Sequence, residues 1–413
     1  MPDLTRIEQR VTDEIARRGA ELVADLELHV NIPTGPGAKS GLDESRERFT
    51  RRLAALGATV RTAPGDPKET WLYSANERPG EIPPTAICRR GAPHESEDDA
   101  KARILLCGHL DTVHEQSSPF RTLTISPDGK TATGPGCVDM KGGLVIAIAA
   151  LEALEACGVP ASWGFILNSD EETGSYHSDR AMQAEARNKY DVALVFEPAM
   201  ADGGLVIERP GSGQFMIEVR GRAGHVGRDF KNSVSAVTAL AKCLTAVAEM
   251  ADPDHGAITN IGPIRGGTAT NIVPDHAAAW GNVRFESPAV AASLGNKLDA
   301  LASHPNVLPL TTIRRSFHRP AKPLTPATQR LAEMARVAAE DLGQRLPFGK
   351  TGGVCDGNNL QAAGLPTIDT LGVRGGGLHT IGEWIEILSL VERCQLLAVL
   401  MVRLTEQGFG ERQ

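Results

Sequence analysis

The chain has 413 residues, which is long enough for two or three domains, and 41% of them are hydrophobic, so it can bury sizeable cores. Its formal net charge is -8 with 23% charged residues, which excludes a uniformly basic surface for a nucleic-acid backbone. No apolar run reaches the roughly 18 residues that a membrane-spanning helix needs. These features predict no nucleic-acid partner and no membrane partner.

The N-terminal segment and the cysteines indicate a cellular compartment. The first residues mix charges with apolar side chains and lack the apolar core of a signal peptide. The seven cysteines are scattered singly without a CxxC pair, and their odd number fits reduced thiols. A cytoplasmic location is therefore expected.

The first half of the chain has the pattern of an α/β domain. Residues 3–28 show helical periodicity, and a second amphipathic helix is expected to end at Gly57. From about residue 100, three short apolar runs alternate with helical stretches; these runs are ARILLCG, SWGFILN and DVALVFE. This alternation predicts helices on a doubly wound, mainly parallel sheet.

The pattern changes near residue 210. Two alternating strands, GQFMIEVRG and AAAWGNVRF, are each followed by a helical stretch, and this unit closes near Phe317. A long helix, short apolar strands (LPTIDTLG) and a final helix (EWIEILSLVERCQLLAVLMVRL) then follow. The predicted organisation is one α/β domain, residues 1–209 and 319–413, interrupted by a smaller α+β domain at residues 210–318.

Three predicted strands end in residues that bind metal ions. The first ends in GHLD with His109 and Asp111, the second in SDEE with Glu171 and Glu172, and the third in FEP with Glu197. Ligands gather outside the carboxyl ends of the strands in open α/β sheets, so these side chains are expected to converge. Each motif alone has a simpler interpretation, such as an exposed acidic turn for SDEE.

Two further candidates follow glycine-rich segments and precede predicted helices. They are Asp139 in GPGCVDMKGG and His379 in GGGLHTIGEW. Imidazole and carboxylate groups suit zinc, and one aspartate can bridge two ions about 3.5 to 4 Å apart. The segment around Asp139 lacks the spacing of a phosphate-binding loop. We therefore predict a two-zinc site.

Neighbouring residues in these motifs are expected to have different roles. Asp111 lies two residues after His109, so it can accept the ring N–H of that histidine. Glu171 and Glu172 are consecutive and project differently, so one should be a ligand and the other a general base.

Taken in order, GHLDTV, GPGCVDMKGG, SDEETGS, FEP and GLHTIGEW resemble the motif series of the M20 metallopeptidases. That family includes glutamate carboxypeptidase, acetylornithine deacetylase, succinyl-diaminopimelate desuccinylase and aminoacylase. The resemblance implies five metal ligands, with Asp139 as the bridge: His109, Asp139, Glu172, Glu197 and His379. It places His109 and Glu197 on one ion, and Glu172 and His379 on the other. It also implies that Asp111 orients His109 and that Glu171 is the general base.

The inserted domain resembles the family's lid or dimerisation domain through GRAGHVG, GGTATNIVP and RRSFHRP. The resemblance implies that His225 helps to hold the oxyanion, reaching across the interface of a homodimer. It also implies that Asn271 and Arg319 hold the free carboxylate of the substrate, for which a planar guanidinium is well suited. Rival arginines for this role are Arg284, Arg314 and Arg315.

The glycine-rich segment KTGGVCDGNN departs from the family pattern. Gly352, Gly353 and Asp356 match it, and the two glycines are implied to bind substrate, but Cys355 occupies the position of a hydroxyl residue. Zinc is the default metal by resemblance, with cobalt or manganese as alternatives.

The expected function is a zinc-dependent amidohydrolase that cleaves an amide bond next to a free carboxylate. Its substrate would be a small peptide that loses its C-terminal amino acid, or an N-acyl amino acid that is deacylated. A dipeptidase or aminopeptidase of the same family is the alternative. A catalytically inactive binding relative is less favoured, because the five ligands and Glu171 are all present in the sequence.

Overall fold

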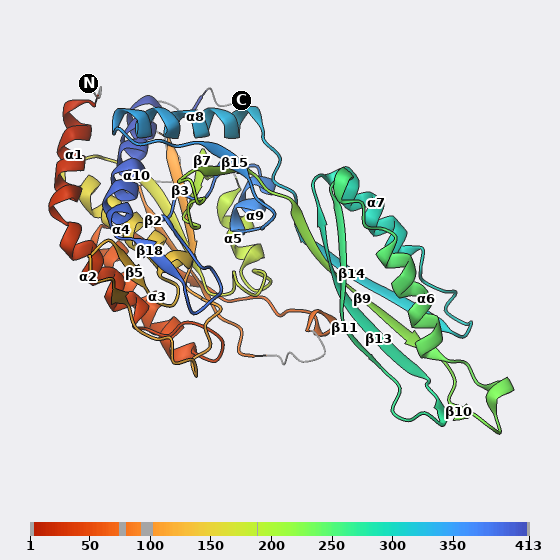
Figure 1. The fold of residues 1–413 in the computed structure, drawn as a ribbon. Coiled ribbons are helices and arrows are strands. Elements are labelled where there is room, and N and C mark those ends of the chain that lie inside the picture. Colours follow the sequence, from red (N-terminus) through yellow and green to blue (C-terminus); the bar gives the residue numbers. More distant parts are fainter. Residues whose placement is uncertain (1–3, 74–79, 92–101, 188, 411–413) are drawn as a thin grey trace.

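A computed structural model describes residues 4–73, 80–91, 102–187 and 189–410. Figure 1 shows a larger α/β part on the left and a smaller, elongated part on the right. The larger part contains both the beginning and the end of the chain, and the smaller part is formed by the segment between them. The α/β class predicted from the sequence is confirmed.

The centre of the larger part is a six-stranded sheet. Its strands are, in spatial order, β1 (Thr59–Ala63), β2 (Thr85–Arg90), β6 (Ser162–Asn168), β3 (Arg103–His109), β7 (Val192–Val195) and β16 (Thr367–Ile368). The last four strands are parallel to one another, as predicted. The antiparallel strands β1 and β2, which extend the sheet at one edge, were not predicted.

Helices cover both faces of this sheet. The helices are α1 (Arg6–Arg17), α2 (Gly19–Val30), α3 (Lys39–Ala55), α4 (Gly142–Ala156), α5 (Asp179–Ala186), α8 (Pro326–Asp341), α9 (Asp356–Ala362) and α10 (Leu388–Gln407). Successive side chains of β3 enter opposite cores: Ile104 and Leu106 pack with α4 and α10, whereas Leu105 and Cys107 pack with α5 and α9. A sheet that is buried on both faces explains the continuous apolar run of this strand.

Two predicted helix boundaries were wrong. Residues 3–28 do not form one helix, because Arg18 leaves the helical path between α1 and α2 and its guanidinium binds Glu21 and Glu152. The final helix begins at Leu388, because the segment before it forms strand β18 (Trp384–Glu386). This strand belongs to a small sheet of order β17-β18-β5-β4, with β17 (Gly375–Gly376), β5 (Thr131–Thr133) and β4 (Thr124–Ile125).

The smaller part is a four-stranded antiparallel sheet with two helices on one face. Its strands are, in order, β11 (Ala257–Gly266), β13 (His276–Phe285), β9 (Gly211–Arg220) and β14 (Leu310–Arg319), and its helices are α6 (Ala236–Ala248) and α7 (Pro288–Asp299). The prediction of two strands was wrong, because β11 and β14 were missed. The first is an edge strand that is interrupted by Gly262 and Pro263, and the second carries the charged run RRSFHR.

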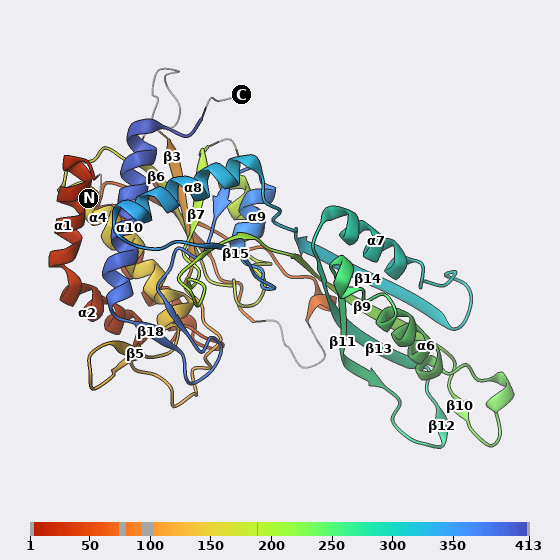
Figure 2. The same ribbon diagram turned by 45° about the horizontal axis from the view of Figure 1, so that its top comes forward.

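Short elements complete the chain. They are β8 (Leu205–Glu208), which pairs in parallel with β15 (Phe348–Lys350), β10 (Gly224–His225), which pairs with β12 (Ile272–Val273), and the helical turns at Thr70–Leu72, Cys137–Lys141, Phe230–Asn232 and Pro253–His255. The β10–β12 pair lies at the end of the smaller part that is farthest from the larger part (Figure 2).

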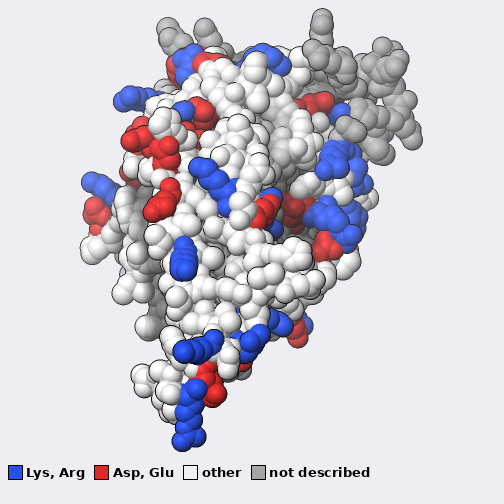
Figure 3. All heavy atoms as spheres, turned by 90° about the vertical axis from the view of Figure 1, so that its right-hand side faces the viewer, with Lys and Arg blue, Asp and Glu red and all other residues white. Residues whose placement is uncertain are grey.

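The charge distribution on the surface and the length of the helices are relevant to possible partners. Viewed from the side of the smaller part, basic and acidic side chains are interspersed among uncharged ones (Figure 3). Among the described helices, none combines the length and the apolar character that crossing a bilayer requires.

Candidate metal centre

Side chains from several loops meet at the carboxyl edge of the parallel strands. His109 is the last residue of β3, the adjacent Glu171 and Glu172 follow β6, and Glu197 lies two residues after β7. Asp139 lies in the helical turn that precedes α4. The doubly wound topology thus places these residues at the edge where ligands bind in such sheets.

Asp139 lies between two histidines. Its Oδ1 atom is 3.2 Å from Nε2 of His109, and its Oδ2 atom is 3.5 Å from Nε2 of His379. Glu197 approaches Nε2 of the first histidine to 4.0 Å, and Glu172 approaches Nε2 of the second to 3.3 Å. The structure therefore brings together all five residues predicted as ligands, with one aspartate oxygen facing each histidine.

The donor set fits metal ions. Among the described residues, two groups have ligand atoms within 4.8 Å of one another: His109, Glu171 and Glu197, and His109, Asp139 and Glu172. One carboxylate oxygen of Glu172 and one of Glu197 are buried without any hydrogen-bond partner. A buried charged oxygen without a partner is costly, and a bound cation would satisfy it.

His109 is oriented by the backbone of Asp111. Its Nδ1 atom donates to the carbonyl oxygen of Asp111 at 2.9 Å, whereas the carboxylate of Asp111 is 3.5 Å away. With Nδ1 as the donor, Nε2 can bind a metal ion together with the neighbouring carboxylates. The Asp111 carboxylate instead accepts the backbone N–H groups of Glu171 and Glu172, at 3.2 and 2.9 Å. Asp111 therefore positions both adjacent glutamates.

Arg319 distinguishes Glu171 from the other carboxylates. This arginine is the last residue of β14 and is 2% exposed. It donates to Oε1 of Glu171 at 2.6 Å, to the backbone oxygen of Glu171 at 3.1 Å and to Oγ of Ser175 at 2.7 Å. Asp356 lies 3.6 Å from the guanidinium and accepts a hydrogen bond from Ser175. Arg319, which the resemblance implies for binding the substrate carboxylate, thus also holds Glu171, the predicted base.

Burial and charge shift the pKa values of the site. Burial raises the pKa of Glu171 to about 7, although Arg319 opposes the shift. Burial also raises the pKa of Glu172 and Glu197. Burial alone would raise the pKa of Asp139, but its histidine partners hold that pKa below its usual value. These carboxylates crowd together, so a bound cation would favour their charged forms.

The smaller part, called the lid below, carries two predicted site residues that lie far from this centre within one chain. His225 in β10 and Asn271 beside β12 are exposed neighbours at the far end of the smaller part, where the N–H of Val226 donates to the backbone oxygen of Asn271 at 3.1 Å (Figure 2). The structure therefore does not bring His225 and Asn271 to the metal ligands.

Arg284, the rival arginine, lies in the same row of the lid sheet as Arg319. Both residues pair with Ser212 of β9, one from each side. The half-buried guanidinium of Arg284 donates to neutral oxygens of Ser212, Asn282 and Val283. Its pKa is lowered by burial and by the nearby Arg319. An anion placed here would be favoured by both guanidinium groups.

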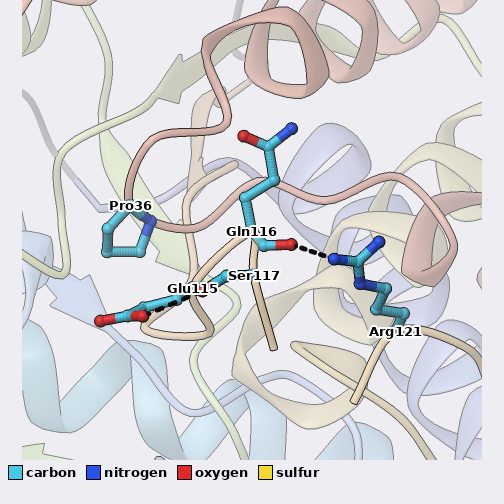
Figure 4. Close-up of a pocket in the computed structure, with 5 residues that line it drawn as sticks. All are labelled: Pro36, Glu115, Gln116, Ser117 and Arg121. Atoms are coloured by element: carbon cyan, nitrogen blue, oxygen red, sulfur yellow. Dashed lines mark hydrogen bonds between the residues drawn. The ribbon is translucent and has the colours of Figure 1, made fainter. Parts of the chain in front are cut away.

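The two predicted glycines lie in an exposed loop. Gly352 lines a pocket of about 400 Å³ that also contains Arg284, and a methyl group on Gly352 would meet no atom within 4 Å. Gly353 accepts a hydrogen bond from Arg209 at 3.2 Å. Another pocket, of about 600 Å³, is lined by Pro36, Glu115, Gln116, Ser117 and Arg121 and contains no predicted site residue (Figure 4).

The other two rival arginines are engaged or remote. Arg315 makes an ion pair with Asp299 of α7 at 2.7 Å on the lid surface. Arg314 is exposed on the same strand, and it pairs across the sheet with Met216.

Sequence reasoning missed several residues that support the centre. Ser175 and Asn168 hydrogen-bond to Asp356, which connects the loop after β6 to the start of α9. Glu383 accepts the backbone N–H of Asp139 at 3.0 Å. The available signals were the acidic residue in KTGGVCDGNN and the glutamate four residues after His379.

Comparisons with known proteins agree with this geometry. Residues 105–403 match Peptidase family M20/M25/M40. Carboxypeptidase G2 of Pseudomonas sp. (strain RS-16) is 27% identical over 408 residues, covering 96% of this chain and 91% of that protein. Succinyl-diaminopimelate desuccinylase 2 of Shewanella loihica is 29% identical over 335 residues, covering 75% and 86%.

A solved structure shares the fold. Aminopeptidase PepT of Bacillus cereus superposes with a TM-score of 0.70 at 22% identity, over 94% of this chain and 99% of that one. Because the family match spans most of the chain and includes the strands that carry the candidate centre, the chain belongs to peptidase family M20/M25/M40 and is a hydrolase of amide bonds.

Proposed function

We propose that the protein uses two metal ions to cleave an amide bond next to a free carboxylate, either by releasing a C-terminal amino acid or by deacylating an N-acyl amino acid. The observation that carries the proposal is the position of Asp139 between His109 and His379, with the carboxylates of Glu172 and Glu197 beside them. The similarity to a carboxypeptidase and a desuccinylase supports the reaction class.

The proposed ligands divide between two ions. His109 and Glu197 would hold one ion, Glu172 and His379 the other, and Asp139 both. Zinc is the proposed metal, because imidazole and carboxylate ligands suit it, with cobalt or manganese as substitutes. When bound, zinc would lower the pKa of a water molecule and polarise the scissile carbonyl group.

Glu171 is the proposed general base. Its carboxylate is largely buried and lies beside the ligands, where it can accept a proton from a metal-bound water and return it. Glu171 would remove a proton from the attacking water and deliver it to the nitrogen of the leaving amine. Arg319 and the Asp111 carboxylate fix its side chain and backbone, respectively.

The substrate carboxylate is proposed to bind where the lid sheet joins the larger part. Arg284 and Arg319 flank Ser212 there, and Arg284 donates only to neutral oxygens among its described partners. The open space at Gly352 lies in the same pocket as Arg284. A substrate carboxylate would give Arg284 the anionic hydrogen-bond partner that neither Glu208 nor Glu286, the glutamates lining this pocket, supplies.

A homodimer through the lid is part of the proposal. His225 and Asn271 are too remote to serve the centre of their own chain, as the position of β10 and β12 at the far end of the lid indicates. Large apolar side chains are exposed around them, including Val226, Phe230 and Ile272. In the proposed dimer, His225 of the partner subunit would stabilise the oxyanion and the partner's Asn271 would contact the substrate.

The test is cleavage of a mixed pool of N-acyl amino acids, folate-like conjugates and dipeptides, followed by mass spectrometry with and without a chelator. Chelator-sensitive release of an amino acid from a substrate with a free carboxylate is the expected result. Cleavage that requires a free amino group would instead support the dipeptidase or aminopeptidase alternative. No cleavage after reconstitution with zinc, cobalt or manganese would support a catalytically inactive relative.

A further inference from the structure

Glu383 is a buried carboxylate that serves neither as a ligand nor as the base. It is 1% exposed and accepts hydrogen bonds from backbone N–H groups and a histidine, whereas the nearby buried Lys141 donates to the backbone oxygen of Ile32. Its Oε1 atom accepts the backbone N–H groups of Val138 at 2.9 Å and Asp139 at 3.0 Å. Its Oε2 atom accepts the N–H of Gly136 at 2.9 Å and the ring N–H of His114 at 2.6 Å.

Three of these four donors are backbone groups of one turn, Gly136–Asp139, which ends at the proposed bridging ligand. Convergent N–H groups of this kind form a concave site for an anion. The backbone of Asp139 is not helical here, with φ -119° and ψ 93°, so the following helix α4 does not fix it. The carboxylate of Glu383 supplies the partners that this irregular backbone would otherwise lack.

The same residue is tied to the loop of the fifth ligand. Glu383 closes a turn that begins right after His379, with its N–H donating to the backbone oxygen of Thr380 at 3.3 Å. His379 has φ 62°, a conformation that costs energy for a residue other than glycine and needs support from its surroundings. Glu383 is therefore the point at which the loops of two proposed ligands are joined.

The small sheet sets the position of Glu383. Trp384, the first residue of β18, pairs with Thr133, the last residue of β5, and Figure 1 shows these strands beside each other. The N–H of Gly134 then donates to the backbone oxygen of Glu383 at 3.1 Å. The register of β5 and β18 thus positions the Glu383 side chain against the turn that leads to Asp139.

We propose that Glu383, itself held by His114, is a positioning residue that sets the Asp139 carboxylate between the two ions and keeps His379 opposite it. The inference rests on the proposed two-metal function. Exchange of one carboxylate oxygen for an NH₂ group would direct a donor at backbone N–H donors, so the turn would have to move. The displacement would act on the metal ligands and not on the pocket for the substrate.

The test compares Glu383→Gln with the wild type in zinc affinity, measured on metal-free protein by competition with a chromophoric chelator. Outer partners of metal ligands typically contribute about 10- to 100-fold to metal affinity or activity, and a loss in this range is expected for at least one of the two ions. The absorption spectrum of the cobalt-substituted protein should change as well, because it reports ligand geometry.

Glu185→Gln is the matched control. Glu185 is equally buried, in α5, but its partners are the side chains of Arg61, Arg89, Lys189 and Tyr190. This variant should lose stability and keep the zinc affinity and the cobalt spectrum of the wild type. The comparison separates the loss of any buried carboxylate from the loss of this one.

His114 provides a second, milder pair of variants. His114→Gln retains an N–H donor for Glu383, whereas His114→Leu leaves one carboxylate oxygen with a single donor. The leucine variant should lower kcat and zinc affinity with little change in KM, and the glutamine variant should recover much of the loss. If a folded Glu383→Gln protein has the zinc affinity, cobalt spectrum and kcat of the wild type, the inference is overturned. A wild-type protein that binds no metal would instead refute the proposed function.

Discussion

The metal centre and the tip of the lid contrast in how their side chains are held. At the centre, Asp139 and Glu171 have partners from distant segments, and of these His109 and Arg319 are buried, whereas His379 is exposed. At the tip, His225 and Asn271 are exposed, and a backbone hydrogen bond between Val226 and Asn271 joins their two segments. The centre is therefore preorganised within one chain, whereas the tip needs another surface to complete it.

The largest expected effect is at the centre. Glu171→Gln should retain both metals and lower kcat by about 10²- to 10⁴-fold, because the ligands remain but proton transfer is lost. The checks are metal content by mass spectrometry and steady-state kinetics. Loss of metal from this variant would show that Glu171 is a ligand, which the group His109, Glu171 and Glu197 also allows geometrically.

At the tip, His225→Ala should lower kcat by about 10²- to 10³-fold, as loss of an oxyanion donor does. Mixing this variant with Glu171→Gln sharpens the comparison. In a mixed dimer, one centre has its own Glu171 and faces a wild-type His225 of the partner subunit, so activity should return on subunit exchange. A monomer by light scattering, or a mixture as inactive as its components, would contradict the role of His225 across an interface.

The two arginines at the junction should differ in their kinetic effects. Arg284→Ala should raise KM about 10- to 100-fold at nearly constant kcat, since it loses a charged hydrogen bond made equally in the ground and transition states. Arg319→Ala should raise KM and also lower kcat, because Arg319 holds Glu171. Equal effects of the two variants on kcat would remove the distinction between them.

The smallest expected effect concerns Glu185, a buried carboxylate remote from the function. Although burial opposes it, hydrogen bonds from Arg89, Tyr190 and Arg61 lower the pKa of Glu185 to about 2, from 4.5. Its contribution to the free energy of unfolding is complete above pH 4.5 and is lost as the pH falls towards 2. Because the arginines are partly exposed, the contribution should be about 1–2 kcal/mol.

Chemical denaturation of the wild type and Glu185→Gln at pH 7 and pH 3 would measure the contribution of the Glu185 carboxylate to the free energy of unfolding. The difference between the two proteins should shrink at the lower pH. A difference that is independent of pH would mean that the carboxylate charge is not the source of the stability.

The sequence was informative where function and secondary structure share the same residues. The candidate ligands follow apolar strands directly, so the pattern that predicts β3, β6 and β7 also predicts where their ends meet. The strand β11 was missed because Gly262 and Pro263 interrupt its pattern, and β14 was missed because the charged run RRSFHR has few apolar residues to alternate.

Contacts between distant segments could not be predicted. The bonds from Arg319 to Glu171 and from Glu383 to the turn before Asp139 join residues more than a hundred positions apart. Their geometry depends on strand register and on how the lid strands enter the larger part, which no local pattern records. The same holds for the distance between His225 and the centre, which follows from the length of the lid strands.

The two chain connections to the lid are Gly211 at the start of β9 and Arg319 at the end of β14; Arg319 contacts the proposed base and pairs with Ser212, the residue after Gly211. In a rigid rotation, the displacement of an atom grows with its distance from the axis. A rotation of the lid about these connections would therefore sweep His225 through a wide arc and leave Arg319 and Glu171 almost stationary. Such a rotation would open and close the far end of the lid for substrate entry and product exit. The geometry of proton transfer at Glu171 would be preserved.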